Sequence, residues 1–240
     1  MTTIREIKTI HVALPNRRSH KFAGQTEEIG GYVLTRMEGD DGNVGWGEAT
    51  VLKDWGGDYG RYYGETPATT KLMIDQYLAP VVIGLEADNF VELHARMDKM
   101  IKGYPYAKAA VDLAAYDLAG RSRDVPVYKL LGGRVRDRIP VAHSIGLIPI
   151  EKAVEEVRQV IGEGVRTIKL KVGVEPTRDI ELVRRIRDAV GPKIDICADA
   201  NCGYRSPGEA IQIIREMERE RLIYVEQPVA GLERIAQVAH

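Results

Sequence analysis

The stretch 166–172 reads RTIKLKV, and it places Lys169 and Lys171 at alternate positions of an expected β-strand. Side chains alternate between the two faces of a strand, so the apolar residues share one face and the two lysines share the other. An inward-facing lysine is costly to bury unless it is paired or functional. Mutual repulsion is expected to lower the pKa of at least one of the lysines, which favours a neutral amine base. The alternative interpretation is an edge strand with one face in water.

Strands and helices alternate with a steady period around this stretch. Expected strands cover residues 140–145, 166–172, 194–199 and 222–226, and expected helices cover 150–161, 178–190 and 207–218, with a last helix from about 232. Repeated β–α units predict a parallel sheet covered by helices. Four successive units fit either half of a (β/α) barrel or part of a doubly wound sheet.

The first half of the sequence follows a different pattern. Turn residues at 39–43 join two of the expected strands, which is typical of an antiparallel meander. Thr66 is expected to cap the first helix, with Pro67 in its first turn. The expected strands are 9–14, 31–38 and 44–48, and the expected helices are 66–77, 89–101 and 106–120. The pattern predicts an α+β domain over residues 1–133 and a β–α domain over residues 134–240.

The alternation stops at His240, inside an expected helix. Four parallel strands cannot close a barrel, and an open sheet edge is a liability. We therefore interpret the sequence as part of a longer protein, apparently truncated. The alternative is that a second copy of the chain covers the open edge.

Composition excludes several classes of protein. The net charge is −1, apolar residues make up 44% and charged residues 29% of the chain, as in ordinary globular domains. No clustered basic face indicates nucleic-acid binding, and no apolar run reaches the ~20 residues that span a bilayer. The N-terminus lacks the apolar core of a signal peptide, so a cytoplasmic location is expected. Cys197 and Cys202 are too few for a disulfide framework, and both are expected to be reduced.

Two carboxylates end the two expected strands that follow Lys171. Asp199 lies 28 residues after Lys171, and Glu226 lies 27 residues after Asp199, so each step is one β–α unit. Active sites of parallel α/β folds collect at the carboxyl ends of the strands. Each acidic residue taken alone is equally typical of a loop, but the spacing predicts that all three side chains share one rim.

The chemistry of such a rim follows from its residue types. Two neighbouring carboxylates form a hard oxygen site of the kind that Mg²⁺ prefers. A lysine beside the metal can act as a general base, and the metal stabilises negative charge that develops on a substrate carboxylate. The pattern predicts a metal-dependent enzyme that removes a proton next to a carboxylate. Lys171 is the expected base, and Asp199 and Glu226 are the expected ligands.

Together these residues resemble the muconate lactonizing enzyme (mandelate racemase/muconate cycloisomerase) subgroup of the enolase superfamily. That subgroup has a Lys-x-Lys on its second barrel strand, matched by Lys169 and Lys171. Its Asp-x-Asn is matched by Asp199 and Asn201, and its Glu-Gln-Pro begins at Glu226. Further matches at 45–48, 107–120 and 130–133 extend the resemblance over essentially the whole chain.

The resemblance implies an α/β protein, with an N-terminal α+β capping domain and a modified (β/α) TIM-type barrel whose first half is present. Lys171 would be the base or acid on one substrate face, and Lys169 would tune it and lie near the substrate carboxylate. Asp199 and Glu226 would bind Mg²⁺ or Mn²⁺, with Asn201 as a supporting residue. A third ligand after the fifth barrel strand, and a lysine on the sixth, would fall beyond the end of the sequence.

Substrate specificity in this subgroup comes largely from two capping-domain loops, expected here at about 15–30 and 49–60. Aromatic and charged residues in them suit a small carboxylate with an apolar or cationic group. The alternative for each residue is ordinary loop packing, and for His143 on the first barrel strand it is a structural histidine. The expected substrate-binding residues are His20, Phe22, Lys53, Asp54, Trp55, Tyr59 and His143.

The implied reaction passes through an enolate, in a cycloisomerase or a racemase/epimerase that acts on a small carboxylate or amino-acid derivative. A homo-oligomer is also implied. An acid-sugar dehydratase of the same superfamily is the nearest alternative. A Schiff-base aldolase with Lys171 as the covalent amine is another, although a Schiff base needs no carboxylate pair. The last alternative is a truncated, non-catalytic homologue that binds a ligand or partner, which is favoured if the chain ends at His240.

Overall fold

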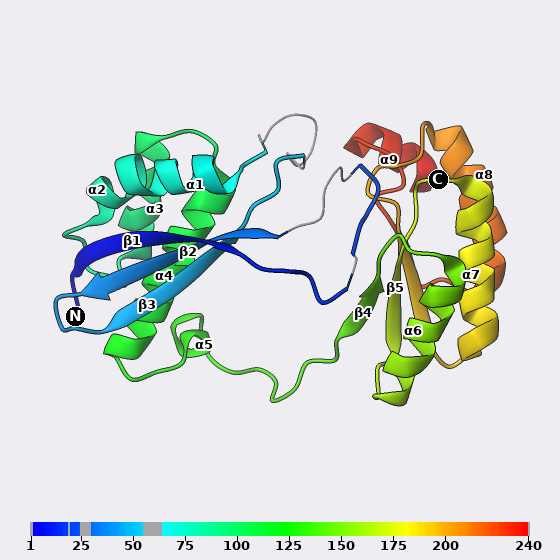
Figure 1. Cartoon of the computed structure of the whole chain (residues 1–240), viewed down its shortest axis with the longest axis horizontal. Helices are drawn as coiled ribbons and strands as arrows, with labels where there is room; N and C mark the ends of the chain where they lie inside the picture. Colours follow the sequence, from blue (N-terminus) through cyan, green and yellow to red (C-terminus); the bar gives the residue numbers. More distant parts are fainter. Residues whose placement is uncertain (1, 19, 25–29, 55–63, 240) are drawn as a thin grey trace. The chain divides into compact units, whose positions relative to one another are not determined.

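The computed structural model describes residues 2–18, 20–24, 30–54 and 64–239. The chain divides into two compact units (Figure 1). The first contains the antiparallel sheet and ends at Asp137. The second begins at Arg138 and also contains the segment that starts at Arg17.

The first unit is built on a three-stranded antiparallel sheet with the strand order β1-β2-β3. Its strands are β1 (Ile4–Ala13), β2 (Gly31–Gly39) and β3 (Val44–Thr50). Helix α4 (Pro105–Ser122) lies across one face of this sheet (Figure 1). The meander predicted from the turn at 39–43 is therefore present, with β1 longer than the predicted strand.

Backbone-to-backbone contact explains why α4 is rich in alanine. A Cβ added to Gly45 would clash with the carbonyl oxygen of Ala114, and one added to Gly47 would clash with that of Ala110. Glycine is required where a backbone approaches this closely. Small side chains on the facing helix surface let α4 settle directly on β3, and they are fully buried there.

The predicted helix 66–77 is not one continuous α-helix in the structure. Thr66 caps α1 as predicted, since its hydroxyl accepts a hydrogen bond from the Thr69 amide at 3.2 Å. The predicted helix 66–77 continues as a π-helical turn and a further helix. Pro80 lacks an amide hydrogen and its ring crowds the preceding turn, which accounts for the change of helix type. Besides α4, the described helices of the first unit are α1 (Pro67–Met73), η1 (Ile74–Leu78), α2 (Ala79–Val82), α3 (Phe90–Met100) and α5 (Val127–Leu130).

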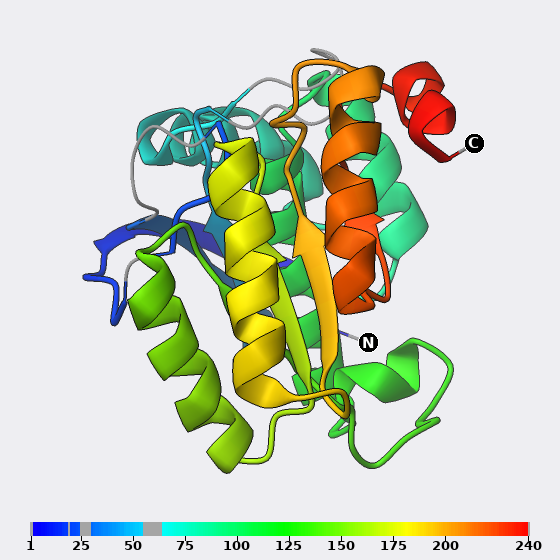
Figure 2. The same cartoon turned by 90° about the vertical axis from the view of Figure 1, so that its right-hand side faces the viewer.

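The second unit is a four-stranded parallel sheet in the order β4-β5-β6-β7. Figure 2 shows α6, α7 and α8 side by side over one face of the sheet. Sequential strand order with helices on one face is the arrangement of an open barrel half, and it excludes a doubly wound sheet. The strands are β4 (Ala142–Ile145), β5 (Thr167–Lys171), β6 (Asp195–Asp199) and β7 (Val225–Glu226); the helices are α6 (Ile150–Gly162), α7 (Pro176–Val190), α8 (Pro207–Met217), the 3₁₀ turn η2 (Glu218–Glu220) and α9 (Leu232–Ala239).

Side-chain alternation separates the core of the second unit from its polar interior. Ile168, Leu170, Ile196 and Ala198 are fully buried between the sheet and the helices. The residues between them in sequence point to the opposite face of the sheet. The lysines and carboxylates predicted from the strand pattern are therefore on the face that the helices leave open.

Within the described ranges, no helix has the length and apolar character needed to cross a bilayer.

Candidate active site

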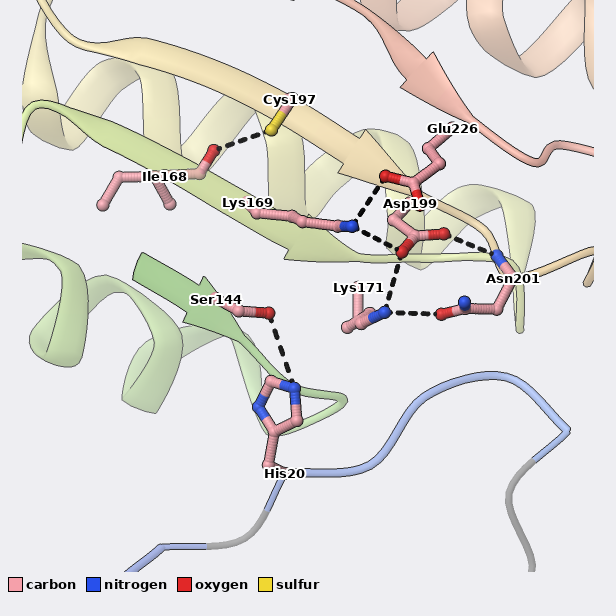
Figure 3. Close-up of polar contacts among 9 residues, drawn as sticks. All are labelled: His20, Ser144, Ile168, Lys169, Lys171, Cys197, Asp199, Asn201 and Glu226. Carbon is pink, nitrogen blue, oxygen red and sulfur yellow. Dashed lines mark hydrogen bonds and ion pairs between the residues drawn. The ribbon is translucent and has the colours of Figure 1, made fainter. Parts of the chain in front are cut away.

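The register of the parallel strands brings the three predicted rim residues together. Lys171 pairs with Asp199 across β5 and β6, and Asp199 pairs with Glu226 across β6 and β7. Lys169 is paired with Cys197 one step earlier. Figure 3 shows these side chains gathered at the carboxyl ends of their strands.

Hydrogen bonds and ion pairs join the two lysines to the carboxylates. Lys171 Nζ donates to Asp199 Oδ2 at 2.8 Å and to Asn201 Oδ1 at 2.7 Å. Lys169 Nζ lies 2.9 Å from Asp199 Oδ2 and donates to Glu226 Oε2 at 2.6 Å. The other oxygen of Asp199 accepts the Asn201 amide at 3.0 Å. Five predicted residues thus form one connected cluster, in which a single Asp199 oxygen contacts both ammonium groups.

The charges in this cluster shift the pKa values of its members. Burial by itself raises the pKa of Asp199, but hydrogen bonds from Lys171, Lys169 and the Asn201 amide outweigh it and lower that pKa. Burial by itself lowers the pKa of Lys169, but its bonds to Glu226 and Asp199 outweigh this effect and raise the pKa well above its ordinary value. Lys169 is therefore not the lysine of lowered pKa that repulsion between the two lysines was expected to produce, because its ammonium contacts two carboxylates. The raised pKa favours the ammonium form of Lys169 in this site.

The segment from Arg17 adds two predicted residues to the cluster's surroundings. The Leu147 amide donates to the Lys21 carbonyl at 2.9 Å, which ties the segment to the loop after β4. The Phe22 ring centroid lies 5.2 Å from Lys171 Nζ, within the range of a cation–π contact. His20 Nε2 lies 3.5 Å from Ser144 Oγ (Figure 3). Burial lowers the pKa of His20, and the nearby charges of Arg18 and Lys171 lower it further.

Among the other predicted substrate-binding residues that the structure describes, His143 is directed away from this cluster. His143 shares a strand face with Ile145, so it points toward the helices, and its Nε2 lies 2.7 Å from Glu156 Oε1 on α6. The expectation that His143 reaches the site is thus corrected by the alternation of β4. Lys53 and Asp54 belong to the first unit. Predicted contacts by Trp55 and Tyr59 lie outside the described residues.

The loops after the two carboxylates have unusual backbone conformations. Asn201, Cys202 and Gln227 have φ angles of 45°, 64° and 40° without being glycine. Such conformations are strained and cluster at functional sites, where the surrounding structure holds them. The Cys202 amide donates to the Gln227 carbonyl at 2.7 Å and so links the two loops.

One buried carboxylate close to the rim was not singled out from the sequence. Asp179 on α7 is fully buried and accepts the amide of Gly173, two residues after Lys171. In sequence it is only an acidic residue near the start of a helix. Favourable interaction with the helix dipole explains such a residue equally well.

The donor set fits a hard divalent cation. Asp199 and Glu226 are register neighbours, and the Lys169 ammonium contacts both, so their carboxylates face the same space. Mg²⁺ in proteins takes a few carboxylate oxygens and keeps several waters. No group of three or more His, Cys, Asp or Glu side chains suited to a metal occurs among the residues that the structure describes. This part of the chain therefore offers two carboxylate ligands.

Family models match nearly the whole chain. Residues 4–132 match the N-terminal domain of the mandelate racemase / muconate lactonizing enzyme family. Residues 152–240 match the enolase C-terminal domain-like family. The two matches correspond to the antiparallel unit and to the parallel unit that contains the lysine–carboxylate cluster.

Individual relatives are similar over most of this chain. An N-succinyl-L-Arg/Lys racemase of Bacillus cereus is 32% identical over 208 residues, 87% of this chain and 54% of the relative. Muconate cycloisomerase 1 of Acinetobacter baylyi is 33% identical over 94% of this chain and 60% of the relative. A dipeptide epimerase from Enterococcus faecalis, crystallised with Mg and the dipeptide L-Leu-L-Tyr, superposes with a TM-score of 0.87 at 30% identity, covering 99% of this chain and 64% of that one. The chain spans less than two thirds of each relative.

Proposed function

This chain belongs to the mandelate racemase/muconate lactonizing enzyme family of the enolase superfamily, and from that membership we propose that it acts in the Mg²⁺-dependent removal of a proton α to a carboxylate. Its relatives include racemases, cycloisomerases and epimerases, which supports isomerisation as the proposed reaction class. The observation that supports the proposal best is the contact of Lys171 with Asp199, beside Glu226, on one strand rim.

Lys171 is the proposed proton carrier. Its side chain is buried, and its nitrogen contacts Asp199, Asn201 and the Phe22 ring. A positioned amine of this kind removes a proton from a bound substrate and returns it from the same face. With Lys171 in its neutral amine form, the α-proton passes to the lone pair of Nζ, which becomes an ammonium, and the electron pair of the broken C–H bond is left on the substrate as an enolate.

Lys169 supplies fixed positive charge. Its raised pKa keeps it an ammonium while it bridges Asp199 and Glu226. A preorganised charge stabilises the negative charge that develops on the substrate carboxylate when the α-proton leaves. Lys169 therefore acts on the carboxylate end of the substrate, and Lys171 acts on the carbon.

Asp199 and Glu226 are the proposed holders of Mg²⁺, with Mn²⁺ as an alternative ion. When bound, the ion supplies positive charge to the substrate carboxylate and so acidifies the neighbouring C–H bond. Asn201 has a supporting role, because its side-chain oxygen orients Lys171 while its amide holds Asp199.

The proposed substrate is a small carboxylate or an N-substituted amino acid. The named relatives act on N-succinyl arginine or lysine and on muconate, and one structure holds a dipeptide. His20 and Phe22 are proposed substrate contacts because they lie beside Lys171. Lys53, Asp54, Trp55 and Tyr59 remain predicted contacts. A cytoplasmic location and a homo-oligomeric state also remain predictions.

Exchange of the α-proton for deuterium tests the proposal directly. The purified protein is incubated in D₂O with Mg²⁺ and a panel of N-succinyl amino acids, dipeptides and muconolactone, and exchange is followed by proton NMR. Lys171→Ala should slow exchange by about 10²–10⁴-fold, the usual contribution of a general base. Exhaustive chelation should also stop exchange, and added Mg²⁺ should restore it.

Lys8→Ala is the matched control, since Lys8 is an exposed lysine of the first unit. It should exchange at the wild-type rate. Undiminished exchange in Lys171→Ala would remove Lys171 from its proposed role. Undiminished exchange after metal removal would refute the role of the ion. Inversion of configuration at the α-carbon would favour a racemase or epimerase, and conversion of muconolactone to muconate would favour a cycloisomerase.

A further inference from the structure

Asp179 holds the loop that follows the proposed proton carrier. Its side chain is fully buried, and Oδ2 accepts the amides of Gly173 at 2.7 Å and Val174 at 3.2 Å. These two residues come directly after Lys171 and Val172. The first turns of α7 and the end of β5 are thereby fixed to each other.

The same carboxylate reaches the loop after β6 through Tyr204. The buried Tyr204 hydroxyl donates to Asp179 Oδ2 at 3.4 Å. The Tyr204 amide donates to the Pro228 carbonyl at 3.2 Å, in the loop that follows Glu226. Asp179 is therefore connected to the loops of both proposed metal ligands.

Arg178 connects Asp179 to the loop after β4. Its Nη1 donates to Asp179 Oδ1 at 3.1 Å, and its Nη2 donates to the Ile148 carbonyl at 2.9 Å. Ile148 lies in the loop between β4 and α6. One charge pair at the start of α7 thus contacts the loops after β4 and β5 and, through Tyr204, those after β6 and β7.

Close backbone packing makes these loops respond together. A Cβ on Gly173, whose φ angle is 93°, would clash with the Ala200 carbonyl oxygen. A Cβ on Gly203 would clash with the Gly173 carbonyl oxygen. No side chain separates the loops after β5 and β6 at these points, so a shift of one displaces the other.

We propose that Asp179, together with Arg178 and Tyr204, is a positioning clamp that sets Lys171 relative to Asp199 and Glu226. The clamp rests on the proposed function for its catalytic meaning, since Asp179 is too deeply buried to touch a substrate. Burying a carboxylate is costly unless its partners are well placed. The partners here are two backbone amides, a phenol and a guanidinium, and together they join four loops of the site. The buried carboxylate therefore holds these loops in fixed positions at the rim.

Asp179→Asn tests the clamp, because asparagine keeps the size of the side chain and removes its charge. Asp188→Asn is the matched control: Asp188 lies on the same helix with 64% of its side chain exposed. In Asp179→Asn the Gly173 and Val174 amides should exchange with solvent about tenfold faster or more, as expected when a local opening becomes easier. The ¹³Cε signal of Lys171 should also shift, which a purely local packing role for Asp179 does not require. Asp188→Asn should change neither quantity.

Tyr204→Phe tests the link from Asp179 to the loop after β6 separately from its link to the loop after β5. It removes one hydroxyl and leaves Asp179 bonded to the loop after β5. The Cys202 amide, which is bonded to Gln227, should then exchange faster while the Gly173 amide stays protected. This variant decides the question if Asp179→Asn does not fold: an unchanged Cys202 amide together with an unchanged Lys171 signal would overturn the clamp.

Titration with Mn²⁺ distinguishes a failure of the proposed metal role from a failure of the clamp. Asp179→Asn should weaken Mn²⁺ binding by about tenfold, at the lower end of the losses seen when outer residues of a metal site are changed. If the wild-type chain binds no Mn²⁺, the metal role proposed above fails, while amide exchange and the Lys171 signal still test the clamp. A folded Asp179→Asn protein with wild-type exchange at Gly173 and an unmoved Lys171 signal would show that Asp179 positions nothing.

Discussion

Two carboxylates in different units are equally buried, but their pKa values are shifted in opposite directions. Asp199 in the second unit and Glu65 in the first are both 1% exposed. Asp199 contacts two lysine ammonium groups, and its pKa is lowered. Among the described residues, the donors to Glu65 are a hydroxyl and two backbone amides, and burial raises its pKa despite these neutral donors. Equal burial therefore does not fix the direction of a carboxylate's pKa shift, which here follows the charge of its donors.

Glu65 has a structural role that its donors explain. Helix α4 starts after Tyr104, which has a left-handed backbone and provides no side-chain cap. Glu65 accepts the Tyr106 amide at 2.8 Å and the Ala107 amide at 3.2 Å, so it satisfies first-turn donors in place of a cap. Its third partner is the Thr70 hydroxyl of α1 at 2.8 Å. The carboxylate thus fastens two helices together.

The largest effect is expected when the same chemical change is made at both sites. Asp199→Asn removes the charge that faces Lys169 and Lys171 and removes a proposed metal ligand. Exchange of the substrate α-proton should fall by about 10²-fold or more, by analogy with the loss of a positioned catalytic group. Glu65→Gln should leave exchange close to the wild-type rate, because no proposed chemistry uses Glu65. NMR in D₂O measures both variants, and equal losses would break the comparison.

A smaller effect is expected on stability in the first unit. Glu65→Ala leaves the Tyr106 and Ala107 amides of α4 without their acceptor, and an unsatisfied buried donor costs about 1–3 kcal/mol. The free energy of unfolding should drop by that amount in urea denaturation followed by circular dichroism. Glu92→Ala is the control, since Glu92 is 45% exposed in an ion pair along one helix. Its cost should stay within about 0.5 kcal/mol, and a similar cost in both variants would mean that Glu65 anchors nothing.

The opposite pKa shifts predict opposite pH dependence. The raised pKa of Glu65 means that the folded state holds its proton more tightly, so its contribution to stability falls as the pH rises from about 4.5 toward the folded value. The lowered pKa of Asp199 means that its contribution is present above about 3.8 and is lost as the pH falls toward the folded value. Each unit of separation corresponds to about 1.4 kcal/mol.

Urea denaturation between pH 3 and 7 tests the two directions. The unfolding free energy of the wild type minus that of Glu65→Gln should decrease as the pH rises. The corresponding difference for Asp199→Asn should increase with pH. Subtracting a variant that cannot titrate at the chosen site isolates that carboxylate from the others. Slopes of the same sign would contradict the idea that donor charge decides the behaviour of a buried carboxylate.

The same contrast explains what the sequence could predict. Lys171, Asp199 and Glu226 were placed on one rim because strand alternation and a period of one β–α unit are local patterns. Neither Glu65 nor Asp179 was identified, because their partners are mainly backbone amides that only the folded chain brings near. Backbone donors are present at nearly every residue and leave no mark in the sequence.

Two further differences arise from geometry that is not local. His143 was expected to reach the site from the first barrel strand, with a structural histidine as the alternative, but it shares the face of Ile145 and contacts Glu156 on α6. The segment from Arg17 joins the second unit, although it lies between strands of the first. Periodicity predicts elements and their faces; it does not predict which unit a connecting segment packs against.

The smallest effect is expected on the pKa of His20, which is lowered in part by the charge of Lys171 at the rim. Burial, Arg18 and Lys171 all lower the pKa of His20 below 6.5, so the folded state favours the neutral ring and loses that stability as the pH falls from about 6.5 toward the lowered value. Lys171→Met removes one of the positive charges and should raise this pKa by a fraction of a unit, measured from the ring-proton shifts in an NMR titration. Lys8→Met is the control, because Lys8 pairs with Glu6 and is not among the charges that shift the pKa of His20. A His20 pKa that does not move in Lys171→Met would mean that Asp199 already screens Lys171 from its neighbours, and the positive charge would then act only within its hydrogen-bonded cluster.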